Sequence, residues 1–294
     1  PYLSRKDIET VEAVIDSESK LVWRVVYFDR FRGPRVLKLN ENLKLLSDTG
    51  VGISWFDQKV YLFPEGPKFS ELKEVTLNDV SFSPALSNAS YEITSEISIP
   101  FYQNPAPLKF SADDPRLDQV QAYFYVDQCL KWIKSSLGIH ALLNLDVQLH
   151  VGHPAKTNAA FYYNGKIRLG EGDGVVYAKI PQDPSIVSHE VFHSLIDVLA
   201  HLPTQGEGGS LNEAFADFFT SQLLKKPELG DTAYVQGPYK RTLNNDKKWT
   251  DKTGGLYGDS LIVSGLLWQL SKTLPEEKIL KVALKTLAHL NPAS

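Results

Sequence analysis

The segment from Asp183 to Ala200 constrains the fold of this chain more than any other. It opens with an Asp at a capping position and Pro184 at the first helical position, and no glycine or further proline follows, so we expect one uninterrupted helix. Residues four apart share a helix face, which points His189 and His193 the same way. Glu190 is turned about 100° from His189. The two imidazoles can therefore contact the same ligand from one face of this helix.

The spacing of these residues predicts a metal site. Two imidazole nitrogens on one face can bind one ion, and the offset Glu190 can reach a water bound to that ion, as in the HExxH motif. The alternative is that both histidines are ordinary polar groups of a core or surface. A third ligand is needed to decide between these interpretations.

A carboxylate at a suitable distance supplies that ligand. Glu213 follows His193 by twenty residues, within a helical segment from Gly209 to Phe219. Two histidines and a glutamate leave one tetrahedral position open, which is typical of a catalytic zinc, so we expect one Zn²⁺ per chain. Asn212 and Asp217 can accept the remaining ring N–H groups of the histidines. The alternative is that Glu213 and Asp217 are ordinary solvated acids of a helix. Their neighbours in the sequence are apolar, and burial beside a cation explains them better, because burying an unpaired carboxylate is costly.

Composition limits the classes of partner. The net charge of −4 and the absence of a long Lys/Arg run exclude a nucleic-acid partner. No apolar stretch reaches the about 18 residues that a membrane span requires. The single cysteine, Cys129, cannot form a disulfide within the chain. No apolar signal stretch is present.

The period of the hydrophobic residues changes along the chain. Residues 1–104 form short alternating segments separated by turn residues, which predicts a β-rich N-terminal region, prodomain-like or accessory. The Pro-rich piece 100–107 is the expected linker, and 105–294 the expected metallopeptidase domain. A helix is expected from Pro115 to the residue before Gly138, strands at 145–149 and 160–163, and mostly helix after Asp183.

HEVFH followed at this distance by NEAFAD resembles the thermolysin-like zinc metallopeptidases, and the likeness runs from about Asn158 to about Leu267. The resemblance implies an α+β fold, a zincin catalytic domain with a β-rich upper lobe, a helical lower lobe and the active-site helix between them. It implies a zinc-dependent endopeptidase in which Glu190 is the general base. The expected substrates are peptides or proteins, and the expected location is secreted or in the cell envelope or periplasm.

Further residues carry over from the resemblance. Asn158 and Ala160 match the family's edge strand, which pairs with the substrate backbone, and Arg241 matches the arginine that holds a substrate carbonyl. The remaining matches are to the family's apolar pocket on the primed side of the cleaved bond, and these are Tyr177, Ile180, Ile186 and Lys240. Lys240 stands where the family has an aliphatic residue, which implies a preference shifted toward side chains that can meet a cation.

The sequence also departs from the family. Tyr257 follows Gly254-Gly255 where the family has a histidine, so we expect the phenol to donate to the developing oxyanion. A purely structural tyrosine is the alternative. The acids of the family's paired calcium site are replaced by Ser185, Leu224 and Thr232, so that calcium site is expected to be absent. The competing function is a catalytically inactive zinc-binding adhesion or interaction protein on the same scaffold.

Overall fold

The computed structural model contains two compact units, Pro1–Phe56 and Asp57–Ser294. It describes residues 8–15, 21–29, 33–40, 42, 45–50, 56–82, 85–88, 90–97, 99, 104, 106–139 and 145–290. In the first unit, four antiparallel strands form one sheet in chain order: β1 (Ile8–Ile15), β2 (Leu21–Asp29), β3 (Gly33–Asn40) and β4 (Leu45–Gly50). These strands lie within the N-terminal region that the sequence predicts to be β-rich.

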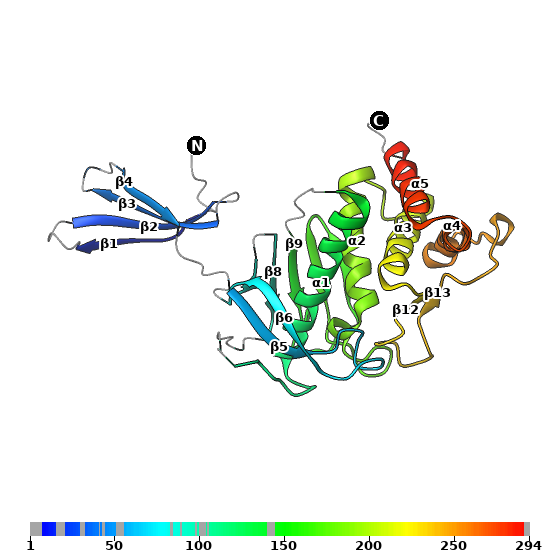
Figure 1. Ribbon diagram of the computed structural model, residues 1–294, viewed down its shortest axis with the longest axis horizontal. Coiled ribbons are helices and arrows are strands. Elements are labelled where there is room, and N and C mark those ends of the chain that lie inside the picture. Colours follow the sequence, from blue (N-terminus) through cyan, green and yellow to red (C-terminus); the bar gives the residue numbers. More distant parts are fainter. Residues whose placement is uncertain are drawn as a thin grey trace. The chain divides into compact units, whose positions relative to one another are not determined.

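The second unit is built on a five-stranded sheet (Figure 1). Its strands lie in the order β10 (Ala160–Tyr163), β11 (Lys166–Leu169), β9 (Leu145–Leu149), β8 (Tyr91–Ser95) and β7 (Leu86–Ser87). The three middle strands run parallel, and β10 is an antiparallel edge. Ile93, Val147 and Ile167 are in register and fully buried, because alternate residues of a strand share one face. A separate hairpin joins β5 (Phe56–Leu62) and β6 (Lys73–Val80).

The division between the units differs from the expected boundary at residue 104. Strand β8 pairs on one side with β7 and on the other with β9, so residues 86–95 belong to the same sheet as residues 145–169. A strand in the interior of a sheet cannot be assigned to another domain. Most of the expected linker, residues 100–103 and 105, lies outside the described residues.

The helices begin and end where local signals place them. The carboxylate of Asp114 accepts a hydrogen bond from the backbone of Arg116 at 2.9 Å at the start of α1 (Pro115–Leu137), and Gly138 ends that helix with a φ of 67°. The remaining elements follow: η1 (Ile180–Gln182), α2 (Pro184–Ala200), α3 (Gly206–Leu224), β12 (Glu228–Leu229), β13 (Arg241–Thr242), η2 (Trp249–Asp251), α4 (Leu256–Ser271) and α5 (Glu276–His289).

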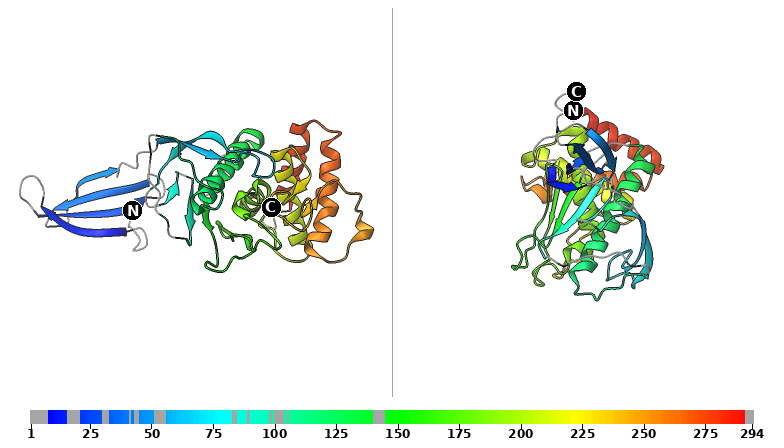
Figure 2. Two further views of the ribbon diagram at one scale, coloured as in Figure 1. Left: turned by 90° about the horizontal axis from the view of Figure 1, so that it is seen from below. Right: turned by 90° about the vertical axis from the view of Figure 1, so that its left-hand side faces the viewer.

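Helix α2 lies between the β-rich and the helical parts of this unit. It contacts α1 and β10 on one side and α3 and α5 on the other, and α3, α4 and α5 (yellow to red) pack together in Figure 2. Fully buried Phe192 of α2 stacks edge-on with Trp132 of α1 at 5.6 Å and lies 5.6 Å from Phe219 of α3. Burying each such ring stabilises the fold by about 1.5–3 kcal/mol. The expected α+β class is confirmed.

Among the described residues, no helix is both long enough and apolar enough to cross a membrane.

Candidate active site

The start of α2 is fixed by one buried carboxylate. Oδ1 of Asp183 accepts hydrogen bonds from the backbone N–H of Ser185 at 2.9 Å and of Ile186 at 3.2 Å. Oδ2 accepts from the backbone N–H of Thr232 at 3.1 Å and of Ala233 at 2.7 Å. Asp183 therefore caps the helix and also ties it to a loop about fifty residues later in the chain, which holds the helix register firmly.

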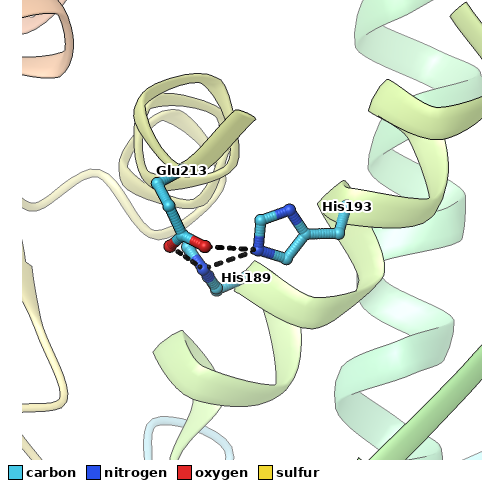
Figure 3. Close-up of side chains that lie close together, drawn as sticks. All are labelled: His189, His193 and Glu213. Carbon is cyan, nitrogen blue, oxygen red and sulfur yellow. Dashed lines mark hydrogen bonds and ion pairs between the residues drawn. The ribbon is translucent and has the colours of Figure 1, made fainter. Parts of the chain in front are cut away.

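Three side chains from α2 and α3 converge on one point (Figure 3). The ligand atoms of His189, His193 and Glu213 all lie within 4.8 Å of one another. Nε2 of His189 lies 3.1 Å from Oε2 of Glu213 and 2.9 Å from Nε2 of His193. Nε2 of His193 lies 3.6 Å from Oε1 of Glu213. The structure thus brings together the three ligands expected from the sequence.

The opposite ring nitrogens of both histidines are held by acceptors. Nδ1–H of His193 donates to Oδ1 of Asn212 at 2.8 Å, and Nδ1–H of His189 donates to Oδ1 of Asp217 at 2.9 Å. These two contacts orient the rings so that each Nε2 faces the centre of the group, as in a metal ligand. Burial acts to lower the pKa of His189, but Asp217 and Glu213 outweigh burial and raise this pKa to about 10, so a bound cation would take the place of a proton on this ring.

Asp217 is completely buried and has a second partner, Arg241. The guanidinium donates from Nε at 2.8 Å and from Nη2 at 2.6 Å, a two-point ion pair. Burial alone would raise the pKa of Asp217, but Arg241 and His189 outweigh burial and lower this pKa to about 2. Nη2 of Arg241 also lies 3.9 Å from Oε2 of Glu213. Arg241 therefore lies against the acid that orients His189 and close to the third ligand.

Glu190 lies beside this group but outside it. Its side chain is buried, and among the residues that the structure describes Oε2 has no hydrogen-bond partner. Burial raises the pKa of Glu190 to about 7, a value at which a carboxylate can both accept and release a proton near neutrality. An unpartnered buried carboxylate oxygen is costly unless something else occupies the site, such as a water or a substrate atom.

The residues present fit a zinc ion. Two imidazole nitrogens and one carboxylate oxygen are a ligand set typical of catalytic zinc, and both imidazoles are oriented through their outer nitrogens. Burial lowers the pKa of His193 to about 4, so its ring is neutral and free to bind a cation at neutral pH. The fit to zinc depends on the chemistry of these three donor groups, two imidazoles and one carboxylate.

The group opens into a cleft of about 820 Å³. Nearly every residue expected at the site lines it: Asn158, Ala160, Tyr177, Ile180, Ile186, His189, Glu190, His193, Asn212, Glu213, Lys240, Arg241 and Tyr257. Asp217 is not part of the cleft wall, because it lies behind His189. Strand β10 contributes one wall with its free edge.

Tyr257 stands in the first turn of α4 with its side chain exposed to the cleft. Its ring centre lies 5.5 Å from the guanidinium carbon of Arg241. The preceding loop is held by Asp259, which accepts hydrogen bonds from the backbone of Thr253 at 2.9 Å and of Gly254 at 2.8 Å. Tyr257 thus has a defined place near the candidate metal centre, next to Arg241.

Asn158 has an interaction that the sequence did not suggest. Its amide donates to Oδ2 of Asp173 at 2.8 Å, and its carbonyl accepts from the backbone of Asp173 at 3.0 Å. Asp173 also accepts hydrogen bonds from Val175 and Val176 at 2.8 Å, which is the arrangement of a tight turn. Asn158 is therefore held in place before any peptide binds.

The region expected to lack calcium is held by lysines. Nζ of Lys226 lies 2.5 Å from Oδ2 of Asp231, and 4.9 Å from the ring centre of Phe69. Nζ of Lys68 donates to the backbone oxygens of Asp231 at 2.8 Å and of Pro238 at 3.2 Å. Two ammonium groups thus supply positive charge to this loop.

Comparison with known proteins gives several relatives but no matching family model. The chain is 32% identical over 112 residues to a zinc metalloproteinase of Listeria monocytogenes, covering 36% of this chain and 21% of that protein. It is 25% identical over 179 residues to bacillolysin of Bacillus caldolyticus, covering 52% of this chain and 32% of that protein. It is 24% identical over 263 residues to an extracellular elastase of Staphylococcus epidermidis, covering 83% of this chain and 48% of that protein.

Among solved structures, the precursor of protealysin, a metalloproteinase from Serratia proteamaculans, matches with a TM-score of 0.49 at 16% identity, covering 69% of this chain and 87% of that one. The chain spans about half or less of the length of these curated relatives. The likeness in sequence nevertheless extends over 112 to 263 residues. The chain is therefore related to the thermolysin-like zinc metallopeptidases.

Proposed function

We propose that this protein is a zinc-dependent endopeptidase. The observation that carries the proposal is the convergence of His189, His193 and Glu213 in a cleft beside Glu190, whose buried Oε2 has no partner. A metal-binding structural protein has no need of that fourth residue, because Glu190 does not belong to the ligand group and its free oxygen has no hydrogen-bond partner among the described residues.

His189, His193 and Glu213 would hold the zinc, one ion per chain. Zinc, when bound, supplies positive charge that polarises a peptide carbonyl and acidifies a water molecule. Glu190 accepts the proton of the attacking water and passes it to the leaving amine. Its elevated pKa, caused by burial, suits a group that must first accept and then release a proton.

The remaining cleft residues position the substrate. Arg241, fixed by Asp217, directs a guanidinium toward the carbonyl oxygen on which negative charge develops, and Tyr257 donates a hydrogen bond to that oxygen. The free edge of β10, from Ala160 onward, pairs with the extended peptide backbone. We also propose that the β-rich N-terminal unit is prodomain-like or accessory, that the paired calcium site is absent, and that the protein acts outside the cytoplasm.

A peptidase assay on wild type and Glu190→Gln, with zinc measured in both, tests the proposal. We expect the wild type to cleave internal peptide bonds, and the variant to retain zinc while losing about 10²–10⁴-fold in rate, as is typical when a general base is removed. Glu277→Gln, an exposed acid-to-amide change on α5, is the matched control and should keep full activity.

Two outcomes would contradict the proposal. A zinc-loaded wild type that cleaves no peptide would favour the inactive adhesion or interaction protein. Equal activity of wild type and Glu190→Gln would mean that the proton is transferred by another group.

A further inference from the structure

The cleft wall contains a cation with no acidic partner. Two of its residues, Lys240 and Arg241, carry a permanent positive charge, and the charge of Arg241 is balanced by Asp217. Lys240 is exposed, and in the part of the chain that the structure describes its ammonium group has no ion-pair partner. Nearby Asp231 is already bound by Lys226. The charge of Lys240 is therefore available to a molecule in the cleft.

The ammonium group of Lys240 is held in place by aromatic rings. Its nitrogen lies 5.8 Å from the ring centre of Tyr177 and 5.0 Å from that of Tyr234, and the two ring centres are 5.7 Å apart. Cation–π contacts of this kind restrain a lysine without neutralising it. The two rings therefore reduce the entropy that Lys240 would lose on binding an anion.

The backbone of Lys240 is held by a hydrogen bond and by close packing. Its N–H donates to the oxygen of Leu229 at 2.9 Å, and a Cβ added to Gly230 would lie 2.8 Å from the Cβ of Lys240. Gly230 has a φ of 71°, so this position needs glycine both for conformation and for space. Close packing thus fixes the backbone position from which the Lys240 side chain extends.

Apolar side chains line the same cleft as Lys240. Ile180 and Ile186 line the cleft together with Tyr177 and Lys240, and Ile180 is buried. A short aliphatic chain that ends in a carboxylate matches such a site, since its methylene groups can contact the isoleucines while its charge reaches Lys240. Lys240 is the cation of this cleft wall that can meet such a carboxylate, since Arg241 is already paired with Asp217.

We propose that Lys240 makes this protein select peptides with an acidic side chain, Glu or Asp, at one position adjacent to the cleaved bond. The inference rests on the proposed peptidase function and names its substrate class. Lys240 acts on specificity, because among the described residues no hydrogen bond or ion pair joins it to the candidate zinc ligands or to Glu190.

Two peptides that differ only in Glu or Gln at each position flanking the cleaved bond provide the test. Their kcat/KM values are measured for the zinc-loaded wild type, for Lys240→Leu and for Lys240→Glu. We expect the wild type to prefer Glu over Gln by about twofold to fivefold at one position, the range of an exposed charge pair. Lys240→Leu should bring the ratio to about one, and Lys240→Glu should invert it.

Lys281→Glu, an exposed lysine on α5 with the same change of net charge, serves as the matched control and should keep the wild-type ratio. The preference should also weaken when the salt concentration is raised from about 0.05 M to about 0.5 M, because screening shortens the range of the interaction.

The failure of this inference differs from the failure of the peptidase function. Cleavage of the Glu and Gln peptides at equal rates by wild type, or an unchanged ratio in Lys240→Leu, would overturn the role of Lys240 and leave the peptidase proposal standing. Absence of cleavage of every peptide would refute the peptidase proposal itself.

Discussion

Replacing Asp217 by Asn removes one charge without changing the shape of the side chain. Asp217 is fully buried and accepts two hydrogen bonds from Arg241 and one from His189. In Asp217→Asn the guanidinium of Arg241, whose side chain is only 18% exposed, loses its two-point partner. An amide NH₂ would also face either the guanidinium or the imidazole N–H, where donor meets donor.

The size of the effect follows from these contacts. Breaking a buried ion pair by removing one partner typically costs about 3–5 kcal/mol, because the other charge stays buried. A domain of ordinary stability has about 5–15 kcal/mol in total, so Asp217→Asn should unfold at a clearly lower urea concentration. Since Asp217 also orients His189, zinc affinity should fall by about 10–100-fold.

Urea unfolding followed by circular dichroism, with and without a zinc chelator, measures the first effect, and competition with a zinc indicator measures the second. Asp197→Asn is the control, since Asp197 is 40% exposed and should lose less than about 1 kcal/mol. The double variant Asp217→Asn/Arg241→Met should recover much of the lost stability, because no uncompensated charge remains. A loss below about 1 kcal/mol in Asp217→Asn, or no recovery in the double variant, would refute this reasoning.

Four other changes have defined outcomes. His193→Ala should reduce zinc from about one ion per chain to a small fraction, because two ligands bind weakly; full zinc by elemental analysis would exclude His193 as a ligand. Tyr257→Phe should lower kcat by about 10²–10³-fold with little change in KM or zinc content, as expected for a donor that acts in the transition state; an unchanged kcat would assign the donor elsewhere. Lys226→Met should cost about 2–4 kcal/mol in urea unfolding, because Asp231 is buried and its Oδ1 has no partner; no loss would mean that this ion pair does not hold the loop. The kcat/KM should fall as the pH drops through a limb between 4.5 and about 7, because Glu190 must be deprotonated to act as a base and a bound cation lowers a pKa that burial has raised; a rate independent of pH over that range would exclude Glu190.

Local signals in the sequence were sufficient for both ends of α1 and for the start of α2, the helix that carries the two histidines. Asp114 and Asp183 mark helix starts through hydrogen bonds to residues two or three positions away, and Gly138 ends its helix with a bond to Ile133, five positions away, so the sequence alone contains the cause. The placing of Glu213 against His189 also followed from the sequence, because two helices carrying matched polar groups among apolar residues can pack in few ways.

Contacts between distant segments could not be predicted in this way. The approach of Tyr234 to Lys240 and the hydrogen bond from the backbone N–H of Thr232 to Asp183 depend on how the loop after α3 folds back, and such loops have no periodic pattern. Helix α3 begins at Gly206, three residues before the expected segment, although glycine disfavours helices. A Cβ on Gly209 would meet the backbone of Thr204 at 2.7 Å, so close packing favours glycine there over intrinsic helix propensity.

The open edge of β10 has a consequence for the behaviour of the protein in concentrated solution. An unpaired strand edge accepts any extended chain, and Phe161 and Tyr163 add exposed aromatic surface, at 48% and 64% exposure. The strand is only four residues long and ends in a turn at Asn164 and Gly165, which limits how far a second molecule can pair. Self-association should therefore compete with a peptide ligand for this edge, so a bound peptide that cannot be cleaved would act as a protectant against aggregation.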